Sequence, residues 1–131
     1  MWDTLRIEPS HLKDLIWIAS SLRDLKDFPE PVQKVMGFAL LQAQCGGRHA
    51  QAKPFNTKGG GVVEMVEDYD TDTYRVVYTA RFGDELYVPH SFQKKSKSGI
   101  KTPKPDVDVI ESRLKIAARL HAERAKQEKG K

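Results

Sequence analysis

The middle of the chain reads Tyr74-Arg75-Val76-Val77-Tyr78-Thr79-Ala80-Arg81. Its even positions hold tyrosine, valine and alanine, and its odd positions hold both arginines with valine and threonine. This period of two predicts a strand with the tyrosines on one face and both Arg75 and Arg81 on the other. An arginine on a buried sheet face needs solvent, an acid or a ligand phosphate as its partner. Two interpretations therefore stay open: an ion pair with Glu64 or Glu67 across the strands, or a guanidinium that holds a phosphate.

Two more β-rich segments flank this strand, at residues 62–67 and 85–92, and the connections between them are short and rich in Asp, Gly and Thr. Short connections of this kind favour an antiparallel meander. The preceding residues 48–61 read as a polar loop that ends in three glycines. Residues 15–19 form a continuous apolar run, which fits either a buried strand or part of a helix.

Helices are predicted on both sides of this sheet. Ser20 and Ser21 start a short helix through Asp27, and Pro31 begins a second helix that ends at Gly46-Gly47. The two helices form a hairpin whose apolar face has to be buried. After Thr102-Pro103-Lys104-Pro105-Asp106, a C-terminal helix carries one apolar stripe, made of Val107, Ile110, Leu114, Ala117 and His121.

The predicted fold class is therefore α+β, with an antiparallel sheet packed against an N-terminal helical hairpin and with a C-terminal helix. We interpret residues 1–131 as a single domain, in which 1–13 is an N-terminal extension and 124–131 a frayed tail.

Composition excludes several classes of protein. The chain has 131 residues, 39% of them hydrophobic and 31% charged, and no apolar run approaches the ~20 residues that cross a bilayer. Mean hydropathy is -0.57. The lone Cys45 forms neither an internal disulfide nor a thiolate metal site, and the four histidines lack ligand spacing. We expect a cytoplasmic protein with no membrane segment, no metal and no cofactor.

The net charge of +4 is unevenly placed along the sequence. Residues 1–67 carry 8 basic and 8 acidic side chains, whereas residues 68–131 carry 14 and 10. The segment 93–105 holds no acid and five lysines, which are Lys94, Lys95, Lys97, Lys101 and Lys104. This segment is either a solvated loop or a patch that attracts phosphate. Directly before it stands His90, which is either a buried structural residue or a proton-transfer group.

A resemblance to a known family rests on an ordered series of motifs. They are Phe28-Pro29, Gly37-Phe38-Ala39-Leu40, Gln44-Cys45-Gly46, Ala52-Lys53-Pro54-Phe55, Gly61-Val62-Val63-Glu64-Met65-Val66, Tyr74-Arg75-Val76-Val77-Tyr78, Tyr87-Val88-Pro89-His90-Ser91-Phe92-Gln93-Lys94-Lys95-Ser96 and Ile100-Lys101-Thr102-Pro103. Together they resemble the phage-derived, HigB-like branch of the RelE/ParE toxin superfamily over roughly residues 14 to 115.

This resemblance implies the toxin of a type II toxin-antitoxin module. Such toxins are typically mRNA interferases, ribosome-dependent endoribonucleases that cut mRNA without a metal through attack of the ribose 2′-hydroxyl on the adjacent phosphate. The implied partners are the ribosome, mRNA and a cognate helix-turn-helix antitoxin, which forms a hetero-oligomer with the toxin. Two rival functions are a ParE-like DNA gyrase poison and a nucleic-acid-binding accessory protein without enzymatic activity.

By position, the resemblance assigns Arg75, Lys94 and Lys95 to the phosphate and His90 to proton transfer. Charge on the C-terminal helix, including Arg113, is assigned to contact with the ribosome or the antitoxin. The predicted RNA-binding residues are Lys53, Lys58, Arg81, Lys97 and Lys101.

The sequence departs from the family at three places. Acidic side chains stand where the best-known RelE enzymes carry strand lysines, and no tyrosine follows Lys95. Pro89 replaces an aliphatic residue and has no amide donor, so it predicts a bulge or an early end to strand pairing just before His90.

Overall fold

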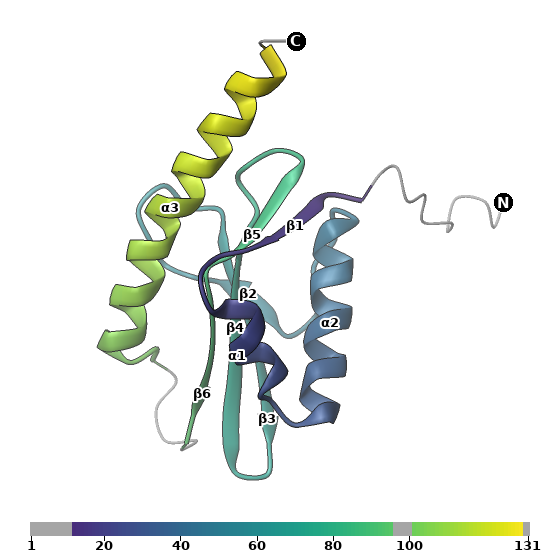
Figure 1. Ribbon diagram of the computed structural model, residues 1–131. Helices are drawn as coiled ribbons and strands as arrows, with labels where there is room; N and C mark the ends of the chain where they lie inside the picture. Colours follow the sequence, from purple (N-terminus) through teal and green to yellow (C-terminus); the bar gives the residue numbers. More distant parts are fainter. Residues whose placement is uncertain (1–11, 96–100, 130–131) are drawn as a thin grey trace, which may run out of the picture.

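The computed structural model describes residues 12–95 and 101–129, and its helices and strands are shown in Figure 1. In chain order they are β1 (Asp14–Trp17), α1 (Ser21–Lys26), α2 (Glu30–Gln44), β2 (Ala52–Pro54), β3 (Val62–Tyr69), β4 (Asp72–Thr79), β5 (Glu85–Val88), β6 (His90–Lys94) and α3 (Lys104–Lys129). The predicted α+β class is confirmed, as are both helices of the hairpin and the C-terminal helix.

The main sheet has four antiparallel strands in the order β2-β3-β4-β6. A two-residue turn joins β3 to β4, and both of its residues, Asp70 and Thr71, have positive φ angles of 50° and 72°. Positive φ at both positions gives a turn whose twist matches that of the flanking strands. The hairpin therefore places β3 and β4 side by side in the centre of the sheet.

The predicted alternation along β4 is confirmed. Tyr74, Val76 and Tyr78 belong to the core under α1 and α2, together with Met36 of α2. Val77 belongs to a second core cluster on the opposite face, with Val62, Phe92, Ile110 and Leu114. Burial of each such side chain is worth about 1.5–3 kcal/mol.

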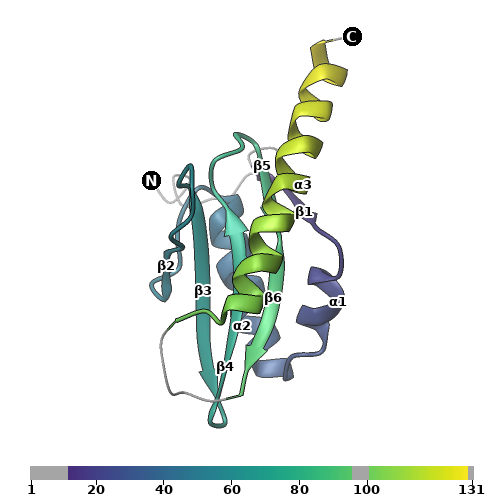
Figure 2. The ribbon, with the colours of Figure 1, turned by 90° about the vertical axis from the view of Figure 1, so that its left-hand side faces the viewer.

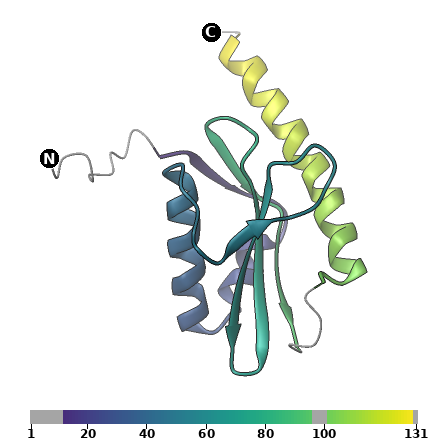
Figure 3. The ribbon, with the colours of Figure 1, turned by 180° about the vertical axis from the view of Figure 1, so that it is seen from behind.

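The sheet is consequently covered on both faces. Figure 1 shows α1 and α2 on one side of the strands and α3 on the other, and the turned view of Figure 2 shows α3 running across the strands with α2 behind them. Figure 3, from behind, shows that the C-terminal part of α3 extends past the end of the sheet. No helix in the described part of the chain is long and apolar enough to cross a membrane.

Pro89 divides the third predicted β segment into two strands. β5 pairs in parallel with β1, whereas β6 pairs with β4, so the expected simple meander is wrong at this point. Leu86 and Val88 pack on the side of the helical hairpin, but Phe92 packs under α3. The alternation of side chains between the two faces of the sheet is therefore offset by one residue at Pro89, which has no amide hydrogen for the hydrogen bonds between strands. This shift turns His90 toward α3.

Three smaller expectations need correction. The polar segment 48–61 contains the short strand β2, because its backbone pairs with β3. The helix α3 extends through Lys129 and so includes most of the segment 124–131. Of the proposed N-terminal extension, residues 1–11 lie outside the described residues; Lys13 exchanges backbone and side-chain hydrogen bonds with Gln44 at the end of α2.

Candidate functional site

The sheet face under α3 collects most of the predicted catalytic side chains. In the register of β4 and β6, Arg75 lies opposite Phe92, Val77 opposite His90, and Thr73 opposite Lys94. Directly opposite residues in a sheet share a face, so Arg75, His90 and Lys94 all belong to this one. The structure thus places these three residues on one face of the sheet.

Arg75 is not open to solvent, because only 3% of its surface is exposed. Its Nη1 donates to Oε1 of Glu64 at 3.1 Å, and the Glu64 side chain is also buried. Thr102, just before α3, donates its hydroxyl to Oε2 of Glu64 at 2.9 Å. The ion pair with Glu64, one of the two interpretations that the sequence left open, is thus the arrangement in this structure.

His90 lies between two charged side chains of α3. Its Nε2 is 2.9 Å from Oδ1 of Asp106, and its Nδ1 is 3.4 Å from Nη1 of Arg113. A guanidinium only donates, so Nδ1 is the acceptor, and we assign the imidazole proton to Nε2, which donates to Asp106. The ring stacks on Phe92 with 4.8 Å between centroids. His90 is therefore held in one orientation and one tautomer.

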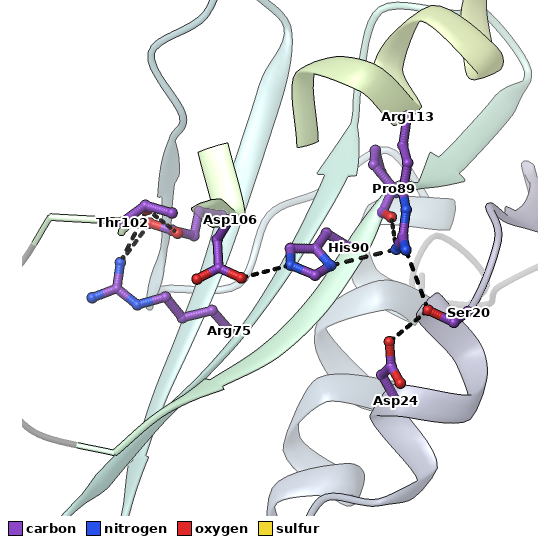
Figure 4. Close-up of polar contacts among 9 residues, drawn as sticks. Ser20, Asp24, Arg75, Pro89, His90, Thr102, Asp106 and Arg113 are labelled. Atoms are coloured by element: carbon purple, nitrogen blue, oxygen red, sulfur yellow. Dashed lines mark hydrogen bonds and ion pairs between the residues drawn. The ribbon is translucent and has the colours of Figure 1, made fainter. Parts of the chain in front are cut away.

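The contacts continue from Arg113 into α1. Its Nη1 also donates to the carbonyl of Pro89 at 3.0 Å, and its Nη2 donates to Oγ of Ser20 at 3.3 Å. Ser20 in turn donates to a carboxylate oxygen of Asp24 at 2.7 Å. Figure 4 shows this chain of contacts, with Arg75 and Thr102 beside it.

The predicted lysines lie around this site and not within it. Lys94 donates to the carbonyl of Lys101 at 3.2 Å, which ties the end of β6 to the segment before α3. Lys95 and Lys101 are exposed. Lys97 lies outside the described residues.

Lys53 on β2 is exposed and lies opposite Glu64 in the register. Glu64 lies opposite Val77, and Val77 opposite His90, so Lys53 and His90 stand at the two ends of one row across the sheet. Three strand spacings separate their backbones by about 14 Å. At this separation the side chain of Lys53 does not reach the imidazole.

Lys58 and Arg81 belong to the other end of the α3 face. Arg81 Nη1 donates to the carbonyls of Lys58 and Gly60 at 3.0 and 2.8 Å, and its guanidinium lies over the ring of Phe82. Six residues of extended chain separate it from Arg75 by roughly 20 Å. The two arginines therefore do not form one cationic site.

A second polar cluster fastens the C-terminal half of α3. Glu85 accepts hydrogen bonds from the Tyr87 hydroxyl at 2.6 Å and from the Arg124 guanidinium, and it contacts Nδ1 of His121 at 2.7 Å. Burial raises the pKa of Glu85, but these three partners outweigh burial and lower it. Burial and the Glu85 carboxylate together raise the pKa of the Tyr87 phenol. This cluster positions α3 on the sheet.

Sequence reasoning missed the roles of Asp106 and Arg113. In the sequence Asp106 reads only as a helix-start signal, and the charge of Arg113 predicts contact with a partner, whereas in the structure Arg113 contacts Pro89, His90 and Ser20. The signal was available, because Asp106 and Arg113 are seven residues apart and share the helix stripe of Ile110 and Leu114. Polar residues on a buried stripe require a partner inside the molecule.

The model of the family described as "Phage derived protein Gp49-like (DUF891)" matches residues 23–115. No curated protein matches the sequence at a significant level. One chain of the crystal structure of the toxin-antitoxin complex RelBE2 from Mycobacterium tuberculosis is similar with a TM-score of 0.44 and 12% identity, over 69% of this chain and 100% of that one. Because the family model spans most of the sequence, the chain belongs to the phage-derived Gp49-like family.

Proposed function

We propose that this protein is the toxin of a type II toxin-antitoxin module and acts as a ribosome-dependent mRNA endonuclease. The observation that carries the proposal is the imidazole of His90, held at 2.9 Å by Asp106 on the same sheet face as a set of basic side chains. Membership in a toxin-like family supports the toxin role. The proposal includes an antitoxin as partner, and the ribosome and mRNA as targets in the cytoplasm.

The reaction needs a proton acceptor and cations. The 2′-oxygen of one ribose bonds to the adjacent phosphorus while the bond from phosphorus to the 5′-oxygen breaks. The 2′-hydroxyl proton passes to His90, and the 5′-oxygen takes a proton from water. The products are a 2′,3′-cyclic phosphate and a 5′-hydroxyl. A positioned base contributes about 100- to 10,000-fold to such a step. This sequence of steps uses no metal or cofactor.

The basic residues differ in how well their environment suits RNA. Lys95, Lys101, Lys53 and Lys58 are exposed and are suited to grip the phosphates of mRNA or ribosomal RNA. Lys94 lies on the same face of the sheet as His90. Arg75 is neutralised by Glu64, and this ion pair favours a structural role over direct stabilisation of the reacting phosphate.

Controlled expression in bacteria, followed by mapping of mRNA 5′ ends, tests the proposal. The wild type should arrest growth and leave breaks with 5′-hydroxyl ends within translated codons. His90→Ala should abolish both effects, whereas His49→Ala, a histidine on the far side of α2 that contacts Phe38 and the backbone amide of Gln51, should retain them. Growth arrest with intact mRNA and damaged DNA would refute the nuclease and indicate a gyrase poison. Steep salt-dependent RNA binding without any cleavage would indicate an accessory binding protein.

A further inference from the structure

Among the arginines that are buried or half-buried in the described residues, Arg113 is the one beside His90. Arg75 is paired with Glu64, and Arg81, which is half-buried like Arg113, donates to the backbone carbonyls of Lys58 and Gly60 at the other end of the α3 face. Arg113 is half-buried, but no carboxylate of the described residues lies within ion-pair distance of it. A guanidinium removed from water without a counter-ion is poised to accept an anion.

The contacts of Arg113 leave its charge largely uncompensated. Its acceptors are the Pro89 carbonyl, the Ser20 hydroxyl and Nδ1 of His90, all of them neutral. The carboxylate of Asp24 accepts from the Ser20 hydroxyl, which stands between it and the guanidinium. The contact with Nδ1 is the longest of the three at 3.4 Å, so it is the one that an incoming oxygen displaces most easily.

The opposite edge of the imidazole is already supported. Asp106 accepts from Nε2 at 2.9 Å, which leaves the lone pair of Nδ1 facing Arg113. A carboxylate in this position stabilises the imidazolium that forms when the ring takes a proton. The proton acceptor and the guanidinium thus lie side by side, with 3.4 Å between Nδ1 and Nη1.

We propose that Arg113 binds the phosphodiester that is cleaved, beside Nδ1 of His90, and that Asp106 is the positioning residue behind the ring. This inference rests on the proposed function and moves the phosphate role from the strand arginine, Arg75, to a helix arginine. When a phosphate oxygen occupies the guanidinium, Nδ1 is released to take the proton of the 2′-hydroxyl. The guanidinium then stabilises the charge that develops on the phosphate.

A consequence concerns α3 as a whole. It supplies two of the three groups, so its packing on the sheet completes the site instead of merely covering it. The charged or titratable groups that face the imidazole are Asp106 and Arg113 from α3, with Asp24 behind Ser20 on the side of α1.

A binding measurement tests the anion site without requiring cleavage. The probe is a dinucleoside monophosphate that lacks the reactive 2′-hydroxyl, titrated while the ring nitrogens of His90 are followed by NMR. The wild type and Arg119→Met, which removes an exposed arginine from the same helix, should both show the Nε2-protonated tautomer and a shift of Nδ1 on titration. Arg113→Met should lose the titration shift. An equal shift in Arg113→Met, or none in the wild type, would overturn the assignment.

Cleavage on purified ribosomes separates this proposal from the proposed function. Arg113→Met should slow cleavage by about 100-fold or more. Asp106→Asn should slow it by about 100-fold and mix the two tautomers of His90, whereas Asp108→Asn, on the exposed side of the same helical turn, should do neither. If the wild type binds the probe through Arg113 but cuts no mRNA, the nuclease function fails and the anion site stands. If the wild type cuts and Arg113→Met cuts equally well, the inference fails and the function stands. Thermal unfolding of each variant confirms that it is folded.

Discussion

Replacing Arg75 with alanine should destabilise the fold strongly, because it leaves the negative charge of Glu64 buried without its partner. The side chains of Arg75 and Glu64 are 3% and 4% exposed, and their atoms meet at 3.1 Å. Removing the guanidinium of Arg75 leaves the carboxylate of Glu64 buried without a counter-ion, at a cost of about 3–5 kcal/mol. A domain of this size has about 5–15 kcal/mol of stability in total, so the variant should lose a large fraction of it.

Urea unfolding of a double-mutant cycle measures this effect. The cycle consists of Arg75→Met and Glu64→Gln, made singly and together. The double variant removes both charges and keeps an acceptor for Thr102, so it should recover most of the loss seen in Arg75→Met alone. Lys34→Ala breaks an exposed pair with Glu30 and serves as the control, with a change below about 0.5 kcal/mol.

Two results would refute this reasoning. A loss below about 1 kcal/mol in Arg75→Ala would mean that the carboxylate of Glu64 finds water or another partner. Additive losses in the double variant would mean that the two side chains are not coupled. The same variants also decide the role of Arg75 in catalysis: a folded double variant that still cuts mRNA at the wild-type rate assigns Arg75 to structure alone.

Three further perturbations probe other parts of the molecule. The pKa of Glu85 in the folded state lies below its ordinary value of 4.5, so the carboxylate stabilises the fold above that pH and loses this contribution as the pH falls through the folded-state pKa. Glu85→Gln should therefore lower the free energy of unfolding at pH 7 and make it depend less on acid pH in urea unfolding. An unchanged pH profile would contradict this. Gly61→Ala should destabilise by about 1–3 kcal/mol more than Gly60→Ala, since both have positive φ but only a Cβ at Gly61 would lie 2.6 Å from Cβ of Arg81; equal losses of stability in thermal unfolding would show that sterics play no part. Lys95→Ala should weaken ribosome binding and reduce the salt slope of log K by about 1, and an unchanged slope in a filter-binding series would exclude a phosphate contact.

Local patterns predicted most of the fold. The alternation in Tyr74–Arg81 placed the tyrosines and Arg75 on opposite faces, and the structure confirms both placements. The 3.6-residue periods and the proline and glycine signals found both helices of the hairpin and the C-terminal helix. The short strand β2 and the pairing of β5 with β1 were missed, because both depend on contacts with distant parts of the chain.

The candidate site was predicted only in part. Its residue types and their common sheet face followed from the strand pattern, and Pro89 was correctly expected to interrupt pairing. Its electrostatics did not follow, because a charge map along the sequence counts Arg75 and Arg113 alike. Only their neighbours distinguish them: Glu64 neutralises the first, whereas the second meets neutral acceptors.

The sequence by itself determined the α+β class, the helical hairpin, the strand faces and the concentration of basic charge in the second half, because each depends on a local period or on composition. Only the tertiary structure decided that His90 faces α3, that Asp106 and Arg113 hold its two ring nitrogens, and that Arg75 is buried with Glu64. Those contacts join residues 11 to 23 positions apart. They exist only because hydrophobic packing of Ile110 and Leu114 seats α3 on the sheet. The helical stripe shows that Asp106 and Arg113 face inward, but the strand residues that they meet there are distant in the sequence and do not follow from its local pattern.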